Sequence, residues 1–217
     1  MRQKILFLSF LLVVSCSGYR YTQTANPFEQ YGIDSLSIPM FYNFSNQPEL
    51  ASSFTRETYK LMSGFSGLKL KSGFSNSTDA VLIGIIRSAE KVADTLRSET
   101  PRVASAVAPQ AVGSNRPEFY VPGITRVALM LQVVVIKRPT TEEIELLQSE
   151  LGTRIPAQGK ILFNETFNLS EAYNREYLDG EAVGVVGTQN AGALRRTKET
   201  LALKAAEQIR DMIIYAF

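Results

Sequence analysis

Residues 127–136, Val-Ala-Leu-Met-Leu-Gln-Val-Val-Val-Ile, form a nearly continuous apolar run in the second half of the chain. The run is much shorter than the ~20 residues that a membrane-spanning helix needs. Its β-branched end favours a strand, and continuous apolar sequence, in place of alternation, is typical of a strand buried on both faces. We therefore expect a strand from Arg126 to Ile136 with apolar neighbours on each side of its sheet.

Three other segments are predicted to form the remaining main strands of the sheet. Residues 33–42 alternate apolar and polar side chains, as a half-buried strand does, and residues 79–86 are a compact apolar run. In residues 161–169 the side chains of one face are Ile, Phe, Phe and Leu. Leu68 and Leu70 mark one shorter extended piece.

Helical periodicity identifies three helices. An apolar stripe from Leu50 to Phe65 follows Asn46, a suitable N-cap, and residues 140–151 are expected to form a short helix. Residues 193–215 turn to Ala, Leu, Lys, Glu and Arg and predict a long terminal helix. The glycine-rich stretch 180–192 lacks the Gly-Lys-Ser/Thr ending of a phosphate loop, so a flexible connector is expected there.

The order of elements is strand, helix, three strands, helix, which suits an α+β fold with two helices packed on one face of a four-stranded mixed sheet. The other face of the 126–136 strand then needs cover. Residues 98–123 contain four prolines and are expected to be a long irregular loop. Either this loop or another protein would cover the second face.

The amino end has the features of an exported lipoprotein. Arg2 and Lys4 precede an apolar run, 5–14, of the length of a signal-peptide core. The run ends in Val13-Val14-Ser15-Cys16, which resembles the bacterial lipobox, where the thiol is acylated and the chain is cleaved in front of it. An ordinary secretory signal with an incidental cysteine is the alternative.

These features predict a signal peptide at 1–15, a lipidated tether at 16–32 and a single domain at 33–217. A triacylated Cys16, carrying fatty acids such as palmitate, is a durable membrane anchor. Ser17 stands where lipoproteins of the inner membrane often carry Asp, which favours the periplasmic face of the outer membrane.

Composition excludes several function classes. Of the 23 basic residues, Arg2 and Lys4 leave with the signal peptide, so the mature chain is formally neutral and carries no general basic field for nucleic acid. The chain has no histidine, and its single cysteine is the lipidated one. The usual general base and the commonest metal ligand are therefore absent. We expect no enzymatic activity, no metal and no cofactor.

The whole pattern resembles the LPS-assembly lipoprotein family LptE. The stretches that carry the resemblance are Cys16-Ser17-Gly18-Tyr19, Ile38-Pro39-Met40-Phe41-Tyr42-Asn43-Phe44-Ser45, the helix 50–62, Thr78-Asp79-Ala80, residues 163–173 and Ala205-Ala206-Glu207-Gln208. Residues 98–123 and 139–159 depart from it, because they look longer than the family core.

The resemblance implies a plug inside the barrel of LptD, the outer-membrane translocon that delivers lipopolysaccharide to the cell surface, and a role in assembling that barrel. It also implies lipopolysaccharide binding through basic residues. Here the corresponding places hold Lys137 and Arg138, and Arg195, Arg196 and Lys198. Paired cations can meet lipid A phosphates, although cations near a helix amino end oppose its dipole. Solvated element ends are the other interpretation of these clusters.

A second function class remains open from sequence. An auxiliary or adhesive surface lipoprotein without a translocon role would carry the same lipobox and the same single domain. It would expose its folded domain to protease on intact cells, whereas a plug would be shielded.

Overall fold

The computed structural model describes residues 25–75, 77–89, 95–103, 120–148, 159–176 and 183–217. The predicted signal peptide, Cys16 and the first part of the tether lie outside these ranges. No helix among the described residues is long and apolar enough to cross a membrane.

One mixed sheet forms the centre of the molecule, and in the described ranges it has seven strands. Its main path is β3-β1-β4-β6-β5, while β2 also pairs with β4, and β7 with β6. The strands are β1 Ser35–Ile38, β2 Tyr42–Asn43, β3 Lys69–Ser72, β4 Ala80–Ser88, β5 Leu96–Val103, β6 Tyr120–Lys137 and β7 Ile161–Asn174. The α+β class and the mixed sheet are confirmed, whereas the expected count of four strands is wrong.

The additional strands arise at three places. The segment expected as one strand over 33–42 is divided into β1 and β2 around Pro39, and the short piece expected at Leu68 and Leu70 corresponds to β3, which begins at Lys69. The expected loop 98–123 is also wrong at both of its ends, because they lie in β5 and β6. Pro101 and Pro122 stand opposite each other in that ladder. Neither proline has a backbone N–H, so this pair forms no N–H hydrogen bond across the ladder, and Pro101 lies on an outermost strand.

Strand β6 organises the sheet, as its apolar sequence predicts. It pairs antiparallel with β4, β5 and β7. Val127, Leu129 and Leu131 point into the main core, and Val133 to Ile136 are buried on both faces. The predicted double burial therefore holds for the carboxyl-terminal part of the strand, while Ala128 and Met130 on the outer face are only half-buried.

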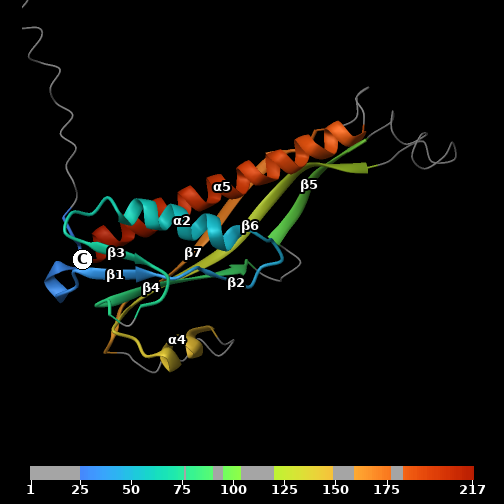
Figure 1. Ribbon diagram of the computed structural model, residues 1–217. Helices are drawn as coiled ribbons and strands as arrows, with labels where there is room; N and C mark the ends of the chain where they lie inside the picture. Colours follow the sequence, from blue (N-terminus) through green and yellow to red (C-terminus); the bar gives the residue numbers. More distant parts are fainter. Residues whose placement is uncertain (1–24, 76, 90–94, 104–119, 149–158, 177–182) are drawn as a thin grey trace, which may run out of the picture.

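Helices α2, Leu50–Met62, and α5, Val183–Ala216, both lie on one face of the sheet (Figure 1), as expected. The predicted cap of α2 is wrong: Glu49 takes the N-cap position with φ 70°, and no side chain caps the helix. Instead, the Asn43 side chain donates to the Gln47 carbonyl over 2.7 Å and shapes the preceding turn.

The second face of the sheet is covered in part by α4, Thr141–Gln148. The Thr140 hydroxyl accepts from the Glu143 backbone, and the Glu143 carboxylate accepts from the Thr140 backbone, a capping box that starts the helix. Ile144 packs on Val81, Ile83 and Val134. Part of the cover thus comes from the segment after β6 within this chain, which the expectation of loop 98–123 or another protein did not include.

The glycine-rich stretch is largely helical, which corrects the expected connector for residues 183–192; residues 180–182 lie outside the described part. Gly184, Gly187 and Gly192 lie inside α5. Each costs up to about 1 kcal/mol relative to alanine in a helix. Packing of the helix against β7 offsets that cost, since tertiary contacts commonly override local propensity.

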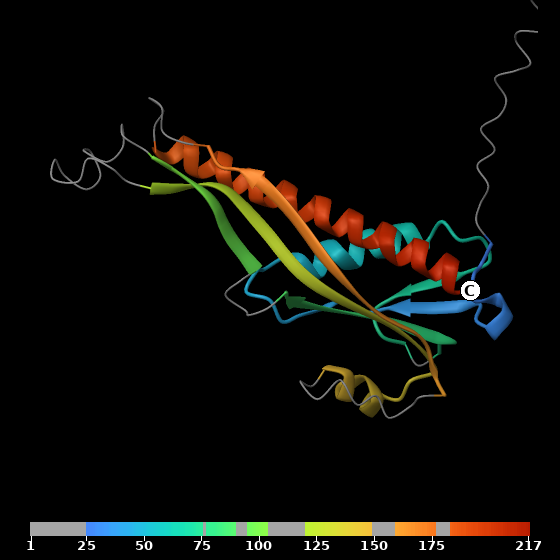
Figure 2. The same ribbon diagram turned by 180° about the vertical axis from the view of Figure 1, so that it is seen from behind.

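The molecule is elongated. Helix α5 has 34 residues, which corresponds to roughly 50 Å at 1.5 Å per residue. Helix α2 lies beside its carboxyl-terminal half, whereas the amino-terminal half of α5 lies over β7 and the far ends of β5 and β6 (Figures 1 and 2). We call this second region the arm. At the opposite end, the base, the rings of Phe28 and Phe217 are 5.0 Å apart.

Candidate ligand site between the edge strand and the long helix

The first predicted cation pair lies at the base. Lys137 donates from Nζ to the Tyr31 carbonyl over 2.7 Å. Arg138 has φ 44°, its backbone N–H donates to the Asp79 carbonyl, and its guanidinium lies 3.5 Å from the Asp79 carboxylate. Both residues therefore join the end of β6 to neighbouring segments, and the side chain of Arg138 stays 73% exposed.

Asp79 is the centre of this junction. Its carboxylate accepts from the Ser35 hydroxyl over 2.6 Å and from the backbone N–H groups of Ser35 and Asp34. The hydrogen bond from the Ser35 hydroxyl is the main cause that lowers the Asp79 pKa, and the backbone donors and Arg138 lower the pKa further. Asp79 thereby connects the start of β4 to the start of β1.

The second predicted cluster lies well inside α5, so the dipole argument against cations near a helix amino end does not apply to it. Arg195 pairs with Glu199 one turn on, at 3.2 Å, and its side chain is 77% exposed. Lys198 is buried, with its Nζ 3.3 Å from the Pro48 carbonyl before α2. Arg196 is exposed and has no hydrogen bond or ion pair with any described residue.

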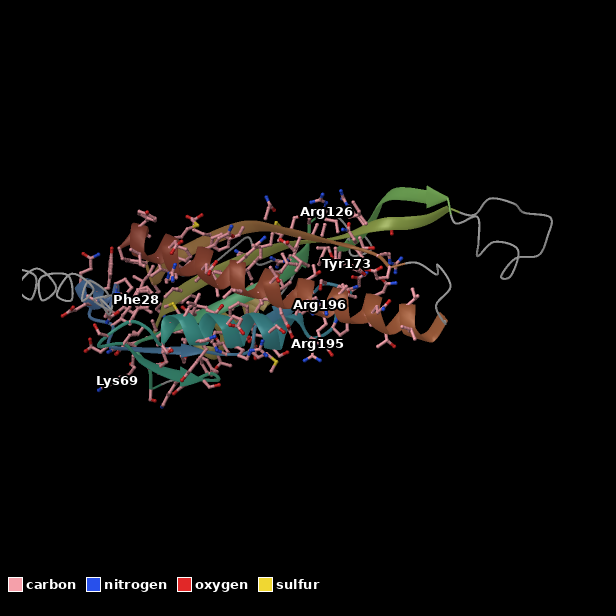
Figure 3. All side chains as sticks on the ribbon, turned by 90° about the horizontal axis from the view of Figure 1, so that it is seen from above. Phe28, Lys69, Arg126, Tyr173, Arg195 and Arg196 are labelled. Carbon is pink, nitrogen blue, oxygen red and sulfur yellow. The ribbon has the colours of Figure 1, made fainter. Side chains whose placement is uncertain are left out.

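The two clusters are not brought together. Lys137 and Arg138 contact residues near the start of β1 and β4, whereas Arg195 and Arg196 lie on α5 near Tyr173, in the arm. Figure 3 shows Arg195 and Arg196 beside Tyr173 and far from Phe28 at the base.

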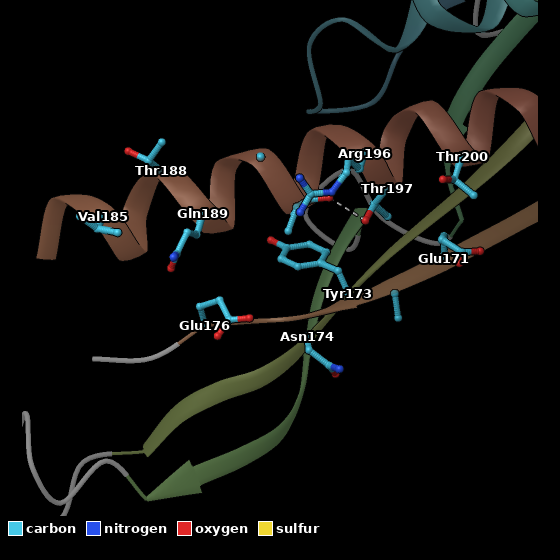
Figure 4. Close-up of a pocket in the computed structure, with 13 residues that line it drawn as sticks. Glu171, Tyr173, Asn174, Glu176, Val185, Thr188, Gln189, Arg196, Thr197 and Thr200 are labelled. Atoms are coloured by element: carbon cyan, nitrogen blue, oxygen red, sulfur yellow. Dashed lines mark hydrogen bonds between the residues drawn. The ribbon is translucent and has the colours of Figure 1, made fainter. Parts of the chain in front are cut away.

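A groove of about 940 Å³ lies between β7 and α5 in the arm (Figure 4). Its strand side is Glu171, Ala172, Tyr173, Asn174 and the following Glu176. Its helix side is one stripe at helical spacing: Val185, Thr188, Gln189, Gly192, Ala193, Arg196, Thr197 and Thr200. Small residues leave space at the middle of the stripe, and Arg196 extends over it beside the Tyr173 ring.

Sequence reasoning selected Arg196 for its charge but missed Tyr173, Asn190 and Glu176. Asn190 lies on α5 next to the groove, and its side chain binds the backbone of Glu176. Had the helix been extended through the glycines, helical spacing would have placed Gln189, Gly192 and Arg196 on one stripe. Among the described residues no group of three or more His, Cys, Asp or Glu could hold a metal ion.

Comparison with known proteins gives fold-level similarity only. No protein-family model matches the chain, and no curated protein matches it in sequence. Solved structures that are similar include the rare lipoprotein B from Shewanella oneidensis, 9% identical with a TM-score of 0.37, over 82% of this chain and 97% of that one. A minor lipoprotein from Acinetobacter baumannii is 16% identical with a TM-score of 0.33, over 82% and 90%.

The PelC dodecamer from Paraburkholderia phytofirmans is 8% identical with a TM-score of 0.36, over 79% of this chain and 84% of that one. Bacterial lipoproteins are thus among the structures to which the chain is similar. At these scores the similarities assign the chain to no family and carry no argument about its function.

Proposed function

We propose that this chain is an outer-membrane lipoprotein of the LptE type, anchored through Cys16, which plugs an LptD-like barrel and helps to assemble it for lipopolysaccharide delivery. The lipobox and the stretches that resemble LptE support this proposal, as does the packing of α2 and α5 on one face of the sheet. The proposal places the domain on the periplasmic face of the outer membrane and includes no catalytic step.

The observation that carries the proposal is the outer face of the sheet beyond α4. There β6 presents Ala128, Met130 and Gln132, and the paired residues of β7 include Thr166 and Ser170. The β6 residues are half-buried and the β7 residues are exposed. The lumen of an outer-membrane barrel is polar, so a sheet face that is polar apart from Ala128 and Met130 is suited to lie against it.

A photo-reactive amino acid at Thr166 tests this surface directly. We expect it to crosslink a large barrel protein in outer-membrane preparations at native expression. Ser52, exposed on α2 at the other side of the molecule, is the matched control position. Equal crosslinking from both positions, or none from Thr166, would contradict a plug that presents this face.

Depletion and protease accessibility separate the plug from its rival, the auxiliary or adhesive surface lipoprotein. A plug requires that depletion causes periplasmic lipopolysaccharide to accumulate and the barrel to misassemble. The rival requires normal lipopolysaccharide delivery and cleavage of the folded domain by protease added to intact cells.

For lipopolysaccharide itself, we propose contacts from Arg138 and Arg195. Both keep most of their side-chain surface exposed, and exposed ion pairs contribute at most about 1 kcal/mol, so phosphate can replace their carboxylates. Arg138→Ala and Arg195→Ala should each weaken binding. Arg56→Ala is the matched control, because Arg56 is also ion-paired and 63% exposed.

A further inference from the structure

Within the described part of the chain, strand β7 lies at one edge of the sheet and pairs with β6 alone. Just beyond it, the Arg175 N–H donates to the Gly123 carbonyl over 2.9 Å. In an antiparallel ladder, alternate residues bond to the neighbouring strand, and those between them point away from it. Ser170, Ala172 and Asn174 therefore direct their N–H and C=O groups off the edge of the sheet, as does Asn168.

Glu176 is the next residue in this outward-pointing series, and it shows how the protein itself satisfies such a position. The Glu176 N–H donates to Asn190 Oδ1 over 2.9 Å, and Asn190 Nδ2 donates to the Glu176 carbonyl over 3.2 Å. A carboxamide offers the same donor and acceptor as a peptide group. Asn190 thus takes the place of a neighbouring strand for one residue.

No described residue takes that place for the next positions along the edge. The outward backbone groups of Ala172 and Asn174 have no partner within the described part of the chain. Four consecutive residues, 171–174, line the groove. The edge of a strand exposes consecutive residues, whereas either face of a strand exposes only every second residue. Gly192 and Ala193, which line the helix side of the groove, are small residues that leave space for side chains of an incoming segment.

A row of outward amide donors and acceptors at strand spacing is matched by another extended backbone. The charged side chains of the groove also restrict which extended segments can bind. Arg196 is exposed without a carboxylate partner among the described residues, while Glu171 is already ion-paired with Lys204. Glu176 lies at the far end of the groove, so an added acidic side chain is favoured opposite Arg196 and disfavoured near Glu176.

We propose that the free edge of β7 from Asn168 to Asn174, with the facing stripe of α5, binds an extended segment of a partner protein as an added strand. Arg196 selects a segment with an acidic side chain directed at α5. The site lies in the arm, and it requires neither acylation of Cys16 nor the outer face of the sheet.

Fluorescence anisotropy with designed peptides and the full-length protein in detergent tests the proposal. The probe is acetyl-Thr-Val-Thr-Glu-Thr-Val-Thr-amide with a fluorophore. We expect it to bind at least about tenfold more tightly than the same peptide with Lys in place of Glu. We expect the same difference from a version that is N-methylated at alternate residues. A tenfold change in affinity is about 1.4 kcal/mol. Equal binding of the N-methylated peptide would overturn strand addition.

Two variants test the protein side. Ala172→Pro removes an outward N–H without touching the ladder to β6 and should abolish binding, with circular dichroism confirming an intact fold. Arg196→Glu should reverse the preference between the Glu and Lys peptides, whereas the matched Arg195→Glu should preserve it. An unchanged preference in Arg196→Glu would overturn the role of Arg196.

A second copy of this chain is the competing occupant. We expect sedimentation of the full-length protein at increasing concentration to give the same oligomeric state for wild type and Ala172→Pro. A dimer that this substitution abolishes would assign the edge to a second copy and overturn the proposal.

Discussion

The carboxamide of Asn190 on α5 forms two hydrogen bonds with the backbone of Glu176, just beyond the end of β7. This pair joins the two elements of the arm at a place where α2 does not reach. The Asn190 side chain therefore adds to the packing of α5 on β7 in fixing the geometry of the groove.

Asn190→Ala should loosen the arm without unfolding the base. We expect the Glu176 amide to exchange its hydrogen faster, and the free energy of unfolding to fall by about 1 kcal/mol, the usual size of a hydrogen bond's net contribution. Gln208→Ala, on the exposed face of the same helix, is the control. Unchanged exchange at Glu176 in Asn190→Ala would show that the pair does not hold the arm.

Asp79 should give the base a stability that depends on pH. Hydrogen bonds, first from the Ser35 hydroxyl, lower its pKa in the folded protein below the ordinary value of 3.8. A depressed folded pKa contributes stability that is complete above the unfolded pKa and is lost as pH falls through the folded pKa. Wild type should therefore exceed Asp79→Asn in unfolding free energy at about pH 7, and the difference should shrink near about pH 2. Glu207→Gln, exposed on α5, should show no such dependence.

Gly84 and Phe41 should be energetically coupled. Gly84 lies in β4, and a Cβ at that position would overlap the ring of Phe41, which is 2% exposed. Gly84→Ala should cost about 1–3 kcal/mol by overpacking, and Phe41→Ala about 3–5 kcal/mol by leaving a cavity. The double variant should lose less than the sum, since the new methyl group occupies part of the cavity. Additive losses in urea unfolding would exclude direct contact between the two sites.

Two cationic side chains of α5, two residues apart, should contribute differently to stability. Lys198→Met keeps the aliphatic stem but removes the ammonium that donates to the Pro48 carbonyl, so it should destabilise the protein by about 1–3 kcal/mol. Arg196→Ala should change stability by less than about 0.5 kcal/mol, because Arg196 is exposed and unpartnered among described residues. Thermal unfolding of both variants measures this, and the opposite ranking would contradict the placement of the two side chains.

Much of the fold is readable from sequence where burial sets the pattern. The apolar run of β6 and the stripe of α2 from Leu50 were identified, because core contacts demand those residues at that spacing. The segments that were misread depend on tertiary contacts. Glycines in α5 look like helix breakers until β7 supports the helix, and Pro101 and Pro122 look like a loop until they face each other at a sheet edge.

The site was less readable. Charge pointed to Arg196, but no property of the sequence distinguishes it from Lys198, which is buried against another element. The partner of Asn190 is the backbone of residue 176, so the residue type at that position does not predict the contact. Pairing across an edge becomes visible only once the register of β7 is known.

The length of α5 fixes the distance between the base and the groove. Ala25, the first described residue, lies beside Phe217 at the base, and Arg196 is separated from Phe217 by roughly 30 Å along one continuous helix. The groove and the base are therefore held apart by one continuous helix. An extended segment bound along the groove would therefore not contact the aromatic cluster at the base, and the two ends of the molecule can be occupied independently.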